Sequence, residues 1–208
     1  MRVLVACEYS GRVRQAFRDL GHDAWSCDLL PSDDDSEFHF QGDVTDYIGG
    51  GIVWSTHENP FHWDLLIAHP PCTRLCNSGV RWLAERDLWD DMREGAKFFN
   101  RLLNAPIPMV AVENPVMHKY AREIVGRRPD FTVQPWQFGD PAKKRTCFWT
   151  RGLPALTATS DMTAADATAD CHLASPGPDR WKQRSMTYQG IANAIAAQWG
   201  GQVLERTG

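Results

Sequence analysis

The sequence of 208 residues lacks the features that mark secreted and membrane proteins. Its N-terminus, MRVLVACEYSG, carries one arginine and only a short apolar stretch, so we expect neither a signal peptide nor a membrane span and place the protein in the cytoplasm. No internal repeat or composition shift divides the chain, which predicts a single domain over residues 1–208. A net charge of −4 and a pI near 6.0 mean that composition alone does not indicate a nucleic-acid binder.

The six cysteines also lack the paired C-x-x-C spacing of a structural zinc site. They are spread along a chain of ordinary size, which is typical of reduced thiols rather than of a disulfide framework. A metal site built from His69, Cys72 and Cys76, with Cys171-His172 as further ligands, is the weaker alternative. We therefore expect no metal, and at least one thiol is available for chemistry.

Short apolar runs recur at the intervals expected of alternating strands and helices. Core strands of a parallel sheet are predicted at residues 3–6, 24–27, 65–68 and 109–112. Helices are predicted from a Ser10 cap to Gly21, and over residues 80–103 and 188–199. Residues 131–150 predict an antiparallel pair at the sheet edge, and residues 30–37 and 153–179 predict loops. The pattern indicates an α/β, Rossmann-like fold with helices on both faces of the sheet.

Polar residues follow several of these predicted strands. In an open α/β sheet, ligands bind beyond the carboxyl ends of the strands, so such residues should share one crevice. Ser10 and Gly11 form a small-residue turn that enters a helix, and Asp28 ends the next strand, an arrangement that cradles a nucleotide and binds its ribose. An acid after a strand is, however, more commonly just part of a solvated turn or a helix cap.

The segment Pro70-Pro71-Cys72 is more specific. Two prolines restrict the backbone and fix the direction of the thiol at a strand end. A thiolate is a strong nucleophile where nearby cations lower its pKa, and Arg74 and Arg145 are the candidate cations. The alternative is a buried, inert cysteine.

Glu113 supplies a carboxyl group at the next strand end, in the segment Glu113-Asn114-Pro115. A protonated Glu113 in the same crevice would hydrogen-bond a ring nitrogen and act as an acid. The alternative is a carboxylate that caps the helix after it.

These segments, in this order, resemble the cytosine-5 DNA methyltransferases, in a minimal, phage-like form. The matching segments are the cofactor loop at residues 5–11, the ribose-binding acid Asp28, the adenine-side turn Gly42-Asp43, the nucleophile loop Pro70-Pro71-Cys72, the cytosine-reading pair Glu113-Asn114, the basic strand Lys143-Lys144-Arg145 and the final helix at residues 190–195. Two differences are that Glu8-Tyr9 replaces a glycine-rich bend and that His69 stands where the family usually has a small residue.

The resemblance implies a Rossmann-like, S-adenosylmethionine-dependent methyltransferase fold and a covalent mechanism. Cys72 is expected to add to carbon 6 of cytosine, Glu113 to engage N3 and the amino group, and Arg145 to hold the O2 side of the ring. S-adenosylmethionine is the expected cofactor, with the expected binding residues Ser10, Gly11, Asp28, Asp43, Pro70 and Asn193. DNA, duplex or single-stranded, is the expected partner, with the expected contacts Arg74, Lys143, Lys144, Arg180, Lys182 and Arg184.

The family's target-recognition domain has no room here, because only a loop-rich segment at residues 153–185 separates the basic strand from the final helix. Reading a base sequence needs a surface that enters a groove. We therefore expect low sequence specificity or a partner protein that supplies it. Two other functions stay open: modification of carbon 5 in a free pyrimidine nucleotide, and non-catalytic nucleic-acid binding on a methyltransferase scaffold.

Overall fold

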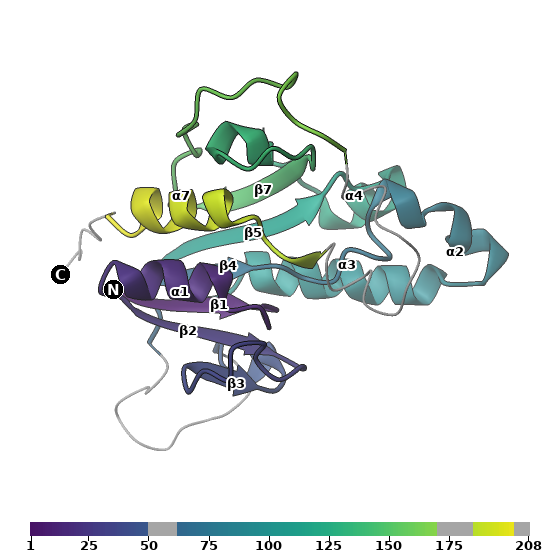
Figure 1. Cartoon of the computed structure of the whole chain (residues 1–208). Coiled ribbons are helices and arrows are strands. Elements are labelled where there is room, and N and C mark those ends of the chain that lie inside the picture. The colour runs from purple at the N-terminus through teal and green to yellow at the C-terminus, as the bar shows by residue number, and fades with distance from the viewer. Residues whose placement is uncertain (50–61, 170–184, 202–208) are drawn as a thin grey trace, which may run out of the picture.

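A computed structural model describes residues 1–49, 62–169 and 185–201. Within these residues, seven strands form one sheet in the order β3-β2-β1-β4-β5-β7-β6 (Figure 1). The strands are β1 (Arg2–Ala6), β2 (Asp23–Asp28), β3 (His39–Gln41), β4 (Leu65–Ala68), β5 (Met109–Pro115), β6 (Phe131–Val133) and β7 (Thr146–Arg151). Strands β1 to β5 pair in parallel, whereas β7 runs antiparallel to both β5 and β6.

Helices cover both faces of this sheet. The helices are α1 (Arg12–Asp19), α2 (Arg81–Glu85), α3 (Trp89–Leu103), α4 (Lys119–Val125) and α7 (Gln189–Trp199), with 3₁₀ turns at Val44–Asp46, Asn77–Gly79 and Pro135–Phe138. Helices α1 and α7 lie side by side on one face, and α3 covers the other (Figure 1). The predicted fold class is confirmed, including the four core strands and the antiparallel edge.

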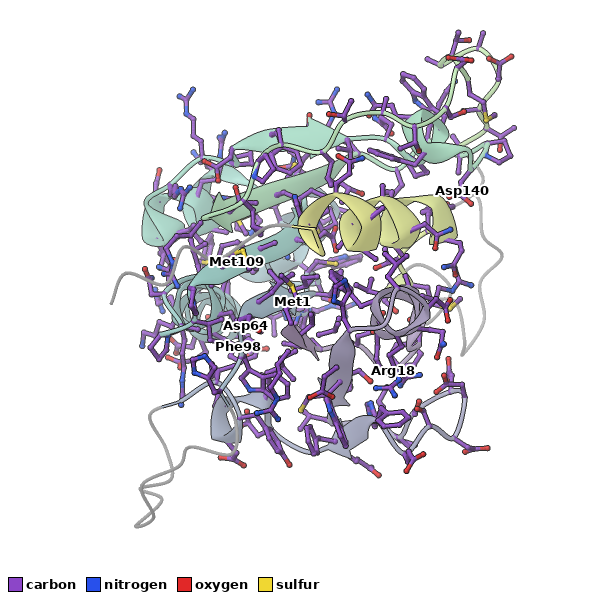
Figure 2. The ribbon with its side chains drawn as sticks, turned by 90° about the vertical axis from the view of Figure 1, so that its left-hand side faces the viewer. Met1, Arg18, Asp64, Phe98, Met109 and Asp140 are labelled. Carbon is purple, nitrogen blue, oxygen red and sulfur yellow. The ribbon has the colours of Figure 1, made fainter. Side chains whose placement is uncertain are left out.

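Alternate residues of each strand serve two separate apolar cores. Val3 and Val5 of β1 pack towards α1 and α7, whereas Leu4 and Ala6 pack towards α3. Successive side chains of a strand point to opposite faces, which is why the central strands read as continuous apolar runs. Side chains fill the layers above and below the sheet (Figure 2).

Two predicted helices differ in detail. The helix predicted over residues 80–103 is two helices, because Asp87 has a φ of 50° and breaks the backbone between α2 and α3. The predicted cap Ser10 is wrong, since α1 begins after Gly11 and no side chain of the N-cap bonds to it. The carboxylate of Glu8 accepts hydrogen bonds from the backbone N–H groups of Val13 and Arg14 instead.

The two predicted loops contain no helix or strand where the structure describes them, at residues 30–37 and 153–169; residues 170–179 lie outside the described ranges. None of the helices described is both long enough and apolar enough to cross a membrane.

Gly190 lets the start of α7 approach the end of the turn at Pro135–Phe138. Its backbone N–H donates to the carboxylate of Asp140, which lies beside this end of α7 (Figure 2). A Cβ at Gly190 would lie 2.0 Å from the carbonyl oxygen of Phe138. The close approach of the two backbones therefore requires glycine.

Gly190→Ala should lower the free energy of unfolding by about 1–3 kcal/mol, because the new methyl group has no space. Denaturant unfolding followed by circular dichroism measures this change. Gly95→Ala in α3 is the matched control: its Cβ would make an ordinary 3.5 Å contact with Leu75, and we expect stabilisation by about 0.5–1 kcal/mol. Equal effects of the two substitutions would contradict the packing described at α7.

Candidate active site

Cys72 lies in the loop that follows β4. His69 and Pro70 extend the strand, and the carbonyl oxygen of Cys72 then accepts hydrogen bonds from the backbone N–H groups of Leu75 and Cys76, both at 2.9 Å. This turn brings the side chains of Cys72 and Cys76 together, and their thiols are hydrogen-bonded to one another. Cys72 is half-buried and Cys76 is buried. The site therefore contains two thiols, of which the sequence pattern indicated one.

The two thiols hold their protons differently. The pKa of Cys72 is raised, first by its hydrogen bond with Cys76 and then by burial and by the negative charge of Glu113, while Lys144 acts in the opposite direction. The hydrogen bond from Cys72, with others from Ser78 and Gly79, lowers the pKa of Cys76 to about 5. Among the causes that act on Cys72, the positive charge of Lys144 is the one that favours its thiolate, the nucleophilic form.

Glu113 and Lys144 reach the same face of the sheet because of the β5–β7 register. Glu113 pairs with Phe148 across the two strands. Side chains alternate along β7 and the residues just before it, so Phe148, Thr146 and Lys144 fall on the side of Glu113. These residues line one small cavity of about 10 Å³ together with Thr187, Tyr188 and Ile191.

Glu113 is held as a carboxylate by His69. The Nδ1 atom of His69 lies 3.2 Å from Oε2 of Glu113, and the two side chains are 8% and 13% exposed. Burial acts to raise the pKa of Glu113, but the hydrogen bond from His69 and the charge of Lys144 outweigh it and lower the pKa. A protonated Glu113 was expected from the sequence, whereas in the structure the lowered pKa favours the carboxylate, which is hydrogen-bonded to Nδ1 of His69.

Arg145 does not reach this cavity. It is exposed and lies on the opposite face of the sheet from Lys144. There it lines a second cavity of about 160 Å³, together with Arg122, Thr132, Cys147 and Trp149. Arg74 lies 3.4 Å from the carboxylate of Asp91. The sequence predicted Arg74 and Arg145 as the cations near Cys72. In the structure the cation that acts on the thiol of Cys72 is Lys144 instead.

The ends of β1, β2 and β3 bring two acidic side chains together. Asp28 and Asp43 both act electrostatically on the thiol of Cys7, which also lies close to Cys27, and burial with these charges raises the pKa of Cys7. Asp28 is half-buried and accepts from the backbone N–H of Leu30, and Asp43 caps the turn at Val44–Asp46 through Thr45. The structure thus places Asp28 and Asp43 near Cys7, where the neighbouring strands β2 and β3 end.

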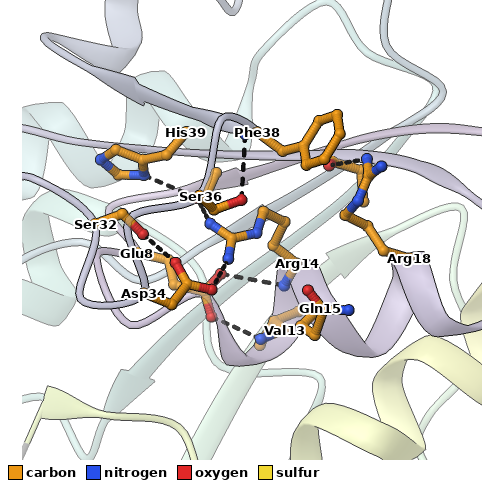
Figure 3. A network of polar contacts seen from close by, with 12 residues as sticks. Glu8, Val13, Arg14, Gln15, Arg18, Ser32, Asp34, Ser36, Phe38 and His39 are labelled. Carbon is orange, nitrogen blue, oxygen red and sulfur yellow. Dashed lines mark hydrogen bonds and ion pairs between the residues drawn. The ribbon is translucent and has the colours of Figure 1, made fainter.

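Glu8 fills the N-terminus of α1, in the bend between β1 and the helix. It is 4% exposed, and burial raises its pKa against the opposing effects of His69 and of the two N–H groups that it accepts from. Behind it, the fully buried Arg14 bonds to Ser26 and forms an ion pair with Asp34, which fixes the acidic loop at residues 30–37 (Figure 3). The first turn of α1 therefore presents a carboxylate, not free N–H groups.

The segment Ser185–Tyr188, just before α7, contacts both the loop after β1 and the residues just before β7. Tyr9 bonds to Ser185 at 3.1 Å, Arg12 donates to the carbonyl oxygen of Thr187 at 3.0 Å and Lys144 donates to that of Met186 at 3.3 Å. These bonds join the loop after β1 to the residue that faces Glu113. The cavity at Glu113 is closed on this side, which accounts for its small volume.

The remaining expected residues are placed as follows. Gly11 has a φ of 67° at the start of α1 with Ser10 before it, and Pro70 is buried beside the nucleophile loop. Asn193 is exposed and its side chain accepts from Gln189, so it does not enter the crevice. Lys143 is exposed next to Lys144. Arg180, Lys182 and Arg184, with Cys171-His172, lie outside the described residues.

Sequence reasoning gave Glu8 no role, considered His69 and Cys76 only as ligands of the weaker metal alternative, and placed Lys144 among the DNA contacts rather than in the site. The alternation of side chains along β7 is the signal that separates Lys144 from Arg145. In the part of the chain that the structure describes, no three His, Cys, Asp or Glu side chains are grouped so as to hold a metal ion.

Three solved structures that match part of this chain are described as methyltransferases. A protein described as a DNA modification methyltransferase encoded within an E. coli prophage is 15% identical over 72% of this chain and 46% of its own, with a TM-score of 0.44. The Entamoeba histolytica methyltransferase EhMeth is 12% identical over 85% and 60%, with a TM-score of 0.45. A Spodoptera frugiperda DNMT2 variant is 11% identical over 77% and 54%, with a TM-score of 0.42.

The chain spans about half the length of these proteins. No protein-family model and no curated protein sequence matches it.

Cys76→Ala should speed alkylation of Cys72 at pH 7–8. Removal of the neighbouring thiol takes away the largest cause of the raised pKa of Cys72, so a larger fraction of Cys72 is thiolate at that pH. Labelling with iodoacetamide, read by peptide mass spectrometry across pH 6–10, measures the rate at Cys72. The rate curve should move to lower pH, and a shift to higher pH would contradict the pairing of the two thiols.

Proposed function

We propose that the protein transfers a methyl group from S-adenosylmethionine to carbon 5 of cytosine in DNA, through a covalent bond to Cys72. The observation that supports this most directly is the grouping of three side chains: the charges of Glu113 and Lys144 both act on the thiol of Cys72, and Glu113 and Lys144 line one cavity. A thiol nucleophile, an acid and a cation near one another are the groups that addition to a pyrimidine ring requires.

Each group has one task in this reaction. The sulfur of Cys72 bonds to carbon 6, and the electron pair of the 5,6 double bond makes carbon 5 nucleophilic while N3 gains a proton on the side of Glu113. Carbon 5 takes the methyl group and then loses its proton to solvent, whereupon the bond to sulfur breaks and Cys72 is released. Lys144, rather than Arg145, holds the O2 side of the ring, since it is the cation that shares the cavity with Glu113.

The cofactor crevice suits a cation better than a phosphate. A dinucleotide places its pyrophosphate on free N–H groups at a helix N-terminus. Here the carboxylate of Glu8 already accepts from those of Val13 and Arg14, so a phosphate would meet a negative charge. S-adenosylmethionine carries no phosphate, and its sulfonium supplies the methyl group. Asp28 and Asp43 would bind its ribose and adenine side, with Gly11 and Pro70 bordering it.

DNA contacts are proposed for cations that have no carboxylate partner among the described residues. Arg122 and Arg145 line the second cavity and suit phosphates of the strand that carries the target base. The segment at residues 153–185 stands in place of a target-recognition domain. The protein should therefore have low specificity for the DNA sequence, or bind a partner protein that supplies this specificity.

The test is transfer of labelled methyl groups to duplex DNA, single-stranded DNA, RNA and dCMP in turn. We expect transfer to carbon 5 of cytosine in DNA and a loss of at least about 1,000-fold for Cys72→Ser, because an alcohol is a far poorer nucleophile at neutral pH. Calorimetry should show that the variant still binds S-adenosylmethionine.

Transfer that survives Cys72→Ser would contradict the covalent mechanism. Transfer to dCMP alone would favour the nucleotide-modifying function. An absence of both transfer and cofactor binding in the wild type would favour the non-catalytic one.

Arg145→Ala should weaken DNA binding without lowering the maximal rate, whereas Lys144→Met should lower the rate and leave binding of DNA within a few-fold. The loss of one phosphate contact reduces the slope of log affinity against log salt by about 1. Fluorescence anisotropy at several salt concentrations measures the slope, and single-turnover kinetics measures the rate. An Arg145→Ala variant that binds normally and turns over slowly would restore Arg145 to the catalytic role.

A further inference from the structure

His69 uses only one of its two ring nitrogens within the described protein. Nδ1 bonds to Glu113, whereas Nε2 is buried and has no hydrogen-bond partner. Two other histidines near strand ends, His39 and His118, differ. His39 bonds through Nδ1 to Ser26 and through Nε2 to the carbonyl oxygen of Leu30.

His118 likewise uses both nitrogens, since Nε2 contacts the carbonyl oxygen of Arg74 and Nδ1 accepts from Ala121. A histidine that only supports the fold satisfies both nitrogens in this way, because a bare buried polar atom costs free energy. The lack of a hydrogen-bond partner for the buried Nε2 of His69 therefore indicates that this nitrogen has a role in the reaction.

Acidic groups face His69 from two neighbouring strands. Glu113 at the end of β5 bonds to it, and Glu8 after β1 is close enough for the charge of His69 to act on its carboxyl group. Lys144, before β7, acts on Glu113 with the opposite charge, and Cys72 follows His69 in the same loop. Arg14 also acts on Glu8, so the charged groups around His69 are two carboxylates and two cations, and the two carboxylates are the groups in position to stabilise an additional proton.

We propose that His69 is the positioning residue that stores this proton and delivers it through Glu113 to N3 of the cytosine ring. This inference rests on the proposed function. Before reaction, Nδ1–H donates to the Glu113 carboxylate, and Nε2 takes up the stored proton. When Cys72 bonds to carbon 6, the Nδ1 proton passes to Glu113 and one proton passes from Glu113 to N3.

When the sulfur leaves, the same proton returns from N3 to Glu113 and then to His69, so the pair is unchanged over the cycle. The arrangement resolves a conflict in the site. An ionised Glu113 has no proton to donate, and a lone carboxylate would repel the unprotonated N3 of neutral cytosine. With His69 beside it, Glu113 accepts a proton from one side as it donates one on the other.

His69→Asn separates the proton role from a structural one. The side-chain amide of asparagine is able to occupy the place of Nδ1–H and keep the bond to Glu113, but it neither stores nor releases a proton. The readout is exchange of the hydrogen at carbon 5 with deuterated water in the absence of a methyl donor, which reports addition of Cys72 alone. His62→Asn, at an exposed position, is the control.

In the wild type, exchange should depend on pH as a bell, because addition needs both a thiolate at Cys72 and a proton for N3. His69→Asn should lower the rate at pH 7.5 by about 100-fold or more and remove the alkaline limb, with affinity for DNA unchanged within about two-fold. An exchange rate within three-fold of the wild type, or an unchanged bell, would overturn the proposal.

Nitrogen-15 spectra of the histidines test the proton store in the wild-type protein without any substrate. We expect Nδ1 of His69 to carry the proton that it donates to Glu113, and Nε2 to be the atom that takes up the stored proton. A bare Nδ1 would overturn the proposal even if the protein is a methyltransferase. An intact proton store with no exchange into any cytosine substrate would instead count against the proposed function.

Discussion

The antiparallel pairing of β7 with β5 is the constraint on which the candidate site depends. It sets Glu113 opposite Phe148, and the alternation of side chains then decides which basic residue faces Glu113. A shift of one residue in this register would exchange Lys144 for Arg145. The buried side chains of Phe148 and Trp149, which belong to opposite cores, make such a shift costly because each would have to enter the other's layer.

The site's charges are arranged around this pairing. Buried carboxylates at Glu8 and Glu113 lie at the ends of neighbouring parts of the sheet, with His69 between them. Lys144 is the single cation that acts on both Cys72 and Glu113 in the described residues. The carboxylates of Glu8 and Glu113, with the proton proposed on His69, suit a reaction in which a cationic cofactor donates a methyl group to a neutral ring. The same negative charges disfavour a cofactor that carries phosphate.

Local patterns predicted the sheet and most helices, because apolar runs and amphipathic periodicity follow directly from the layers that bury them. They placed Cys72 and Glu113 at strand ends for the same reason. The break at Asp87 and the capping by Glu8 were not predictable, since each depends on a backbone angle or a bond between residues that no periodic pattern encodes. The choice between Lys144 and Arg145 needed a register, which requires the partner strand.

The account's central claim is that Cys72 forms a bond to carbon 6 of cytosine. Fluorine at carbon 5 cannot leave as a proton does, so an oligonucleotide with 5-fluorocytosine should remain attached to the enzyme after methyl transfer. Peptide mass spectrometry of this complex, formed with S-adenosylmethionine present, locates the bond. The account predicts the methylated nucleotide on the peptide that contains Cys72. A nucleotide on any other cysteine, or methyl transfer to ordinary cytosine with no adduct on the fluorinated strand, would contradict it.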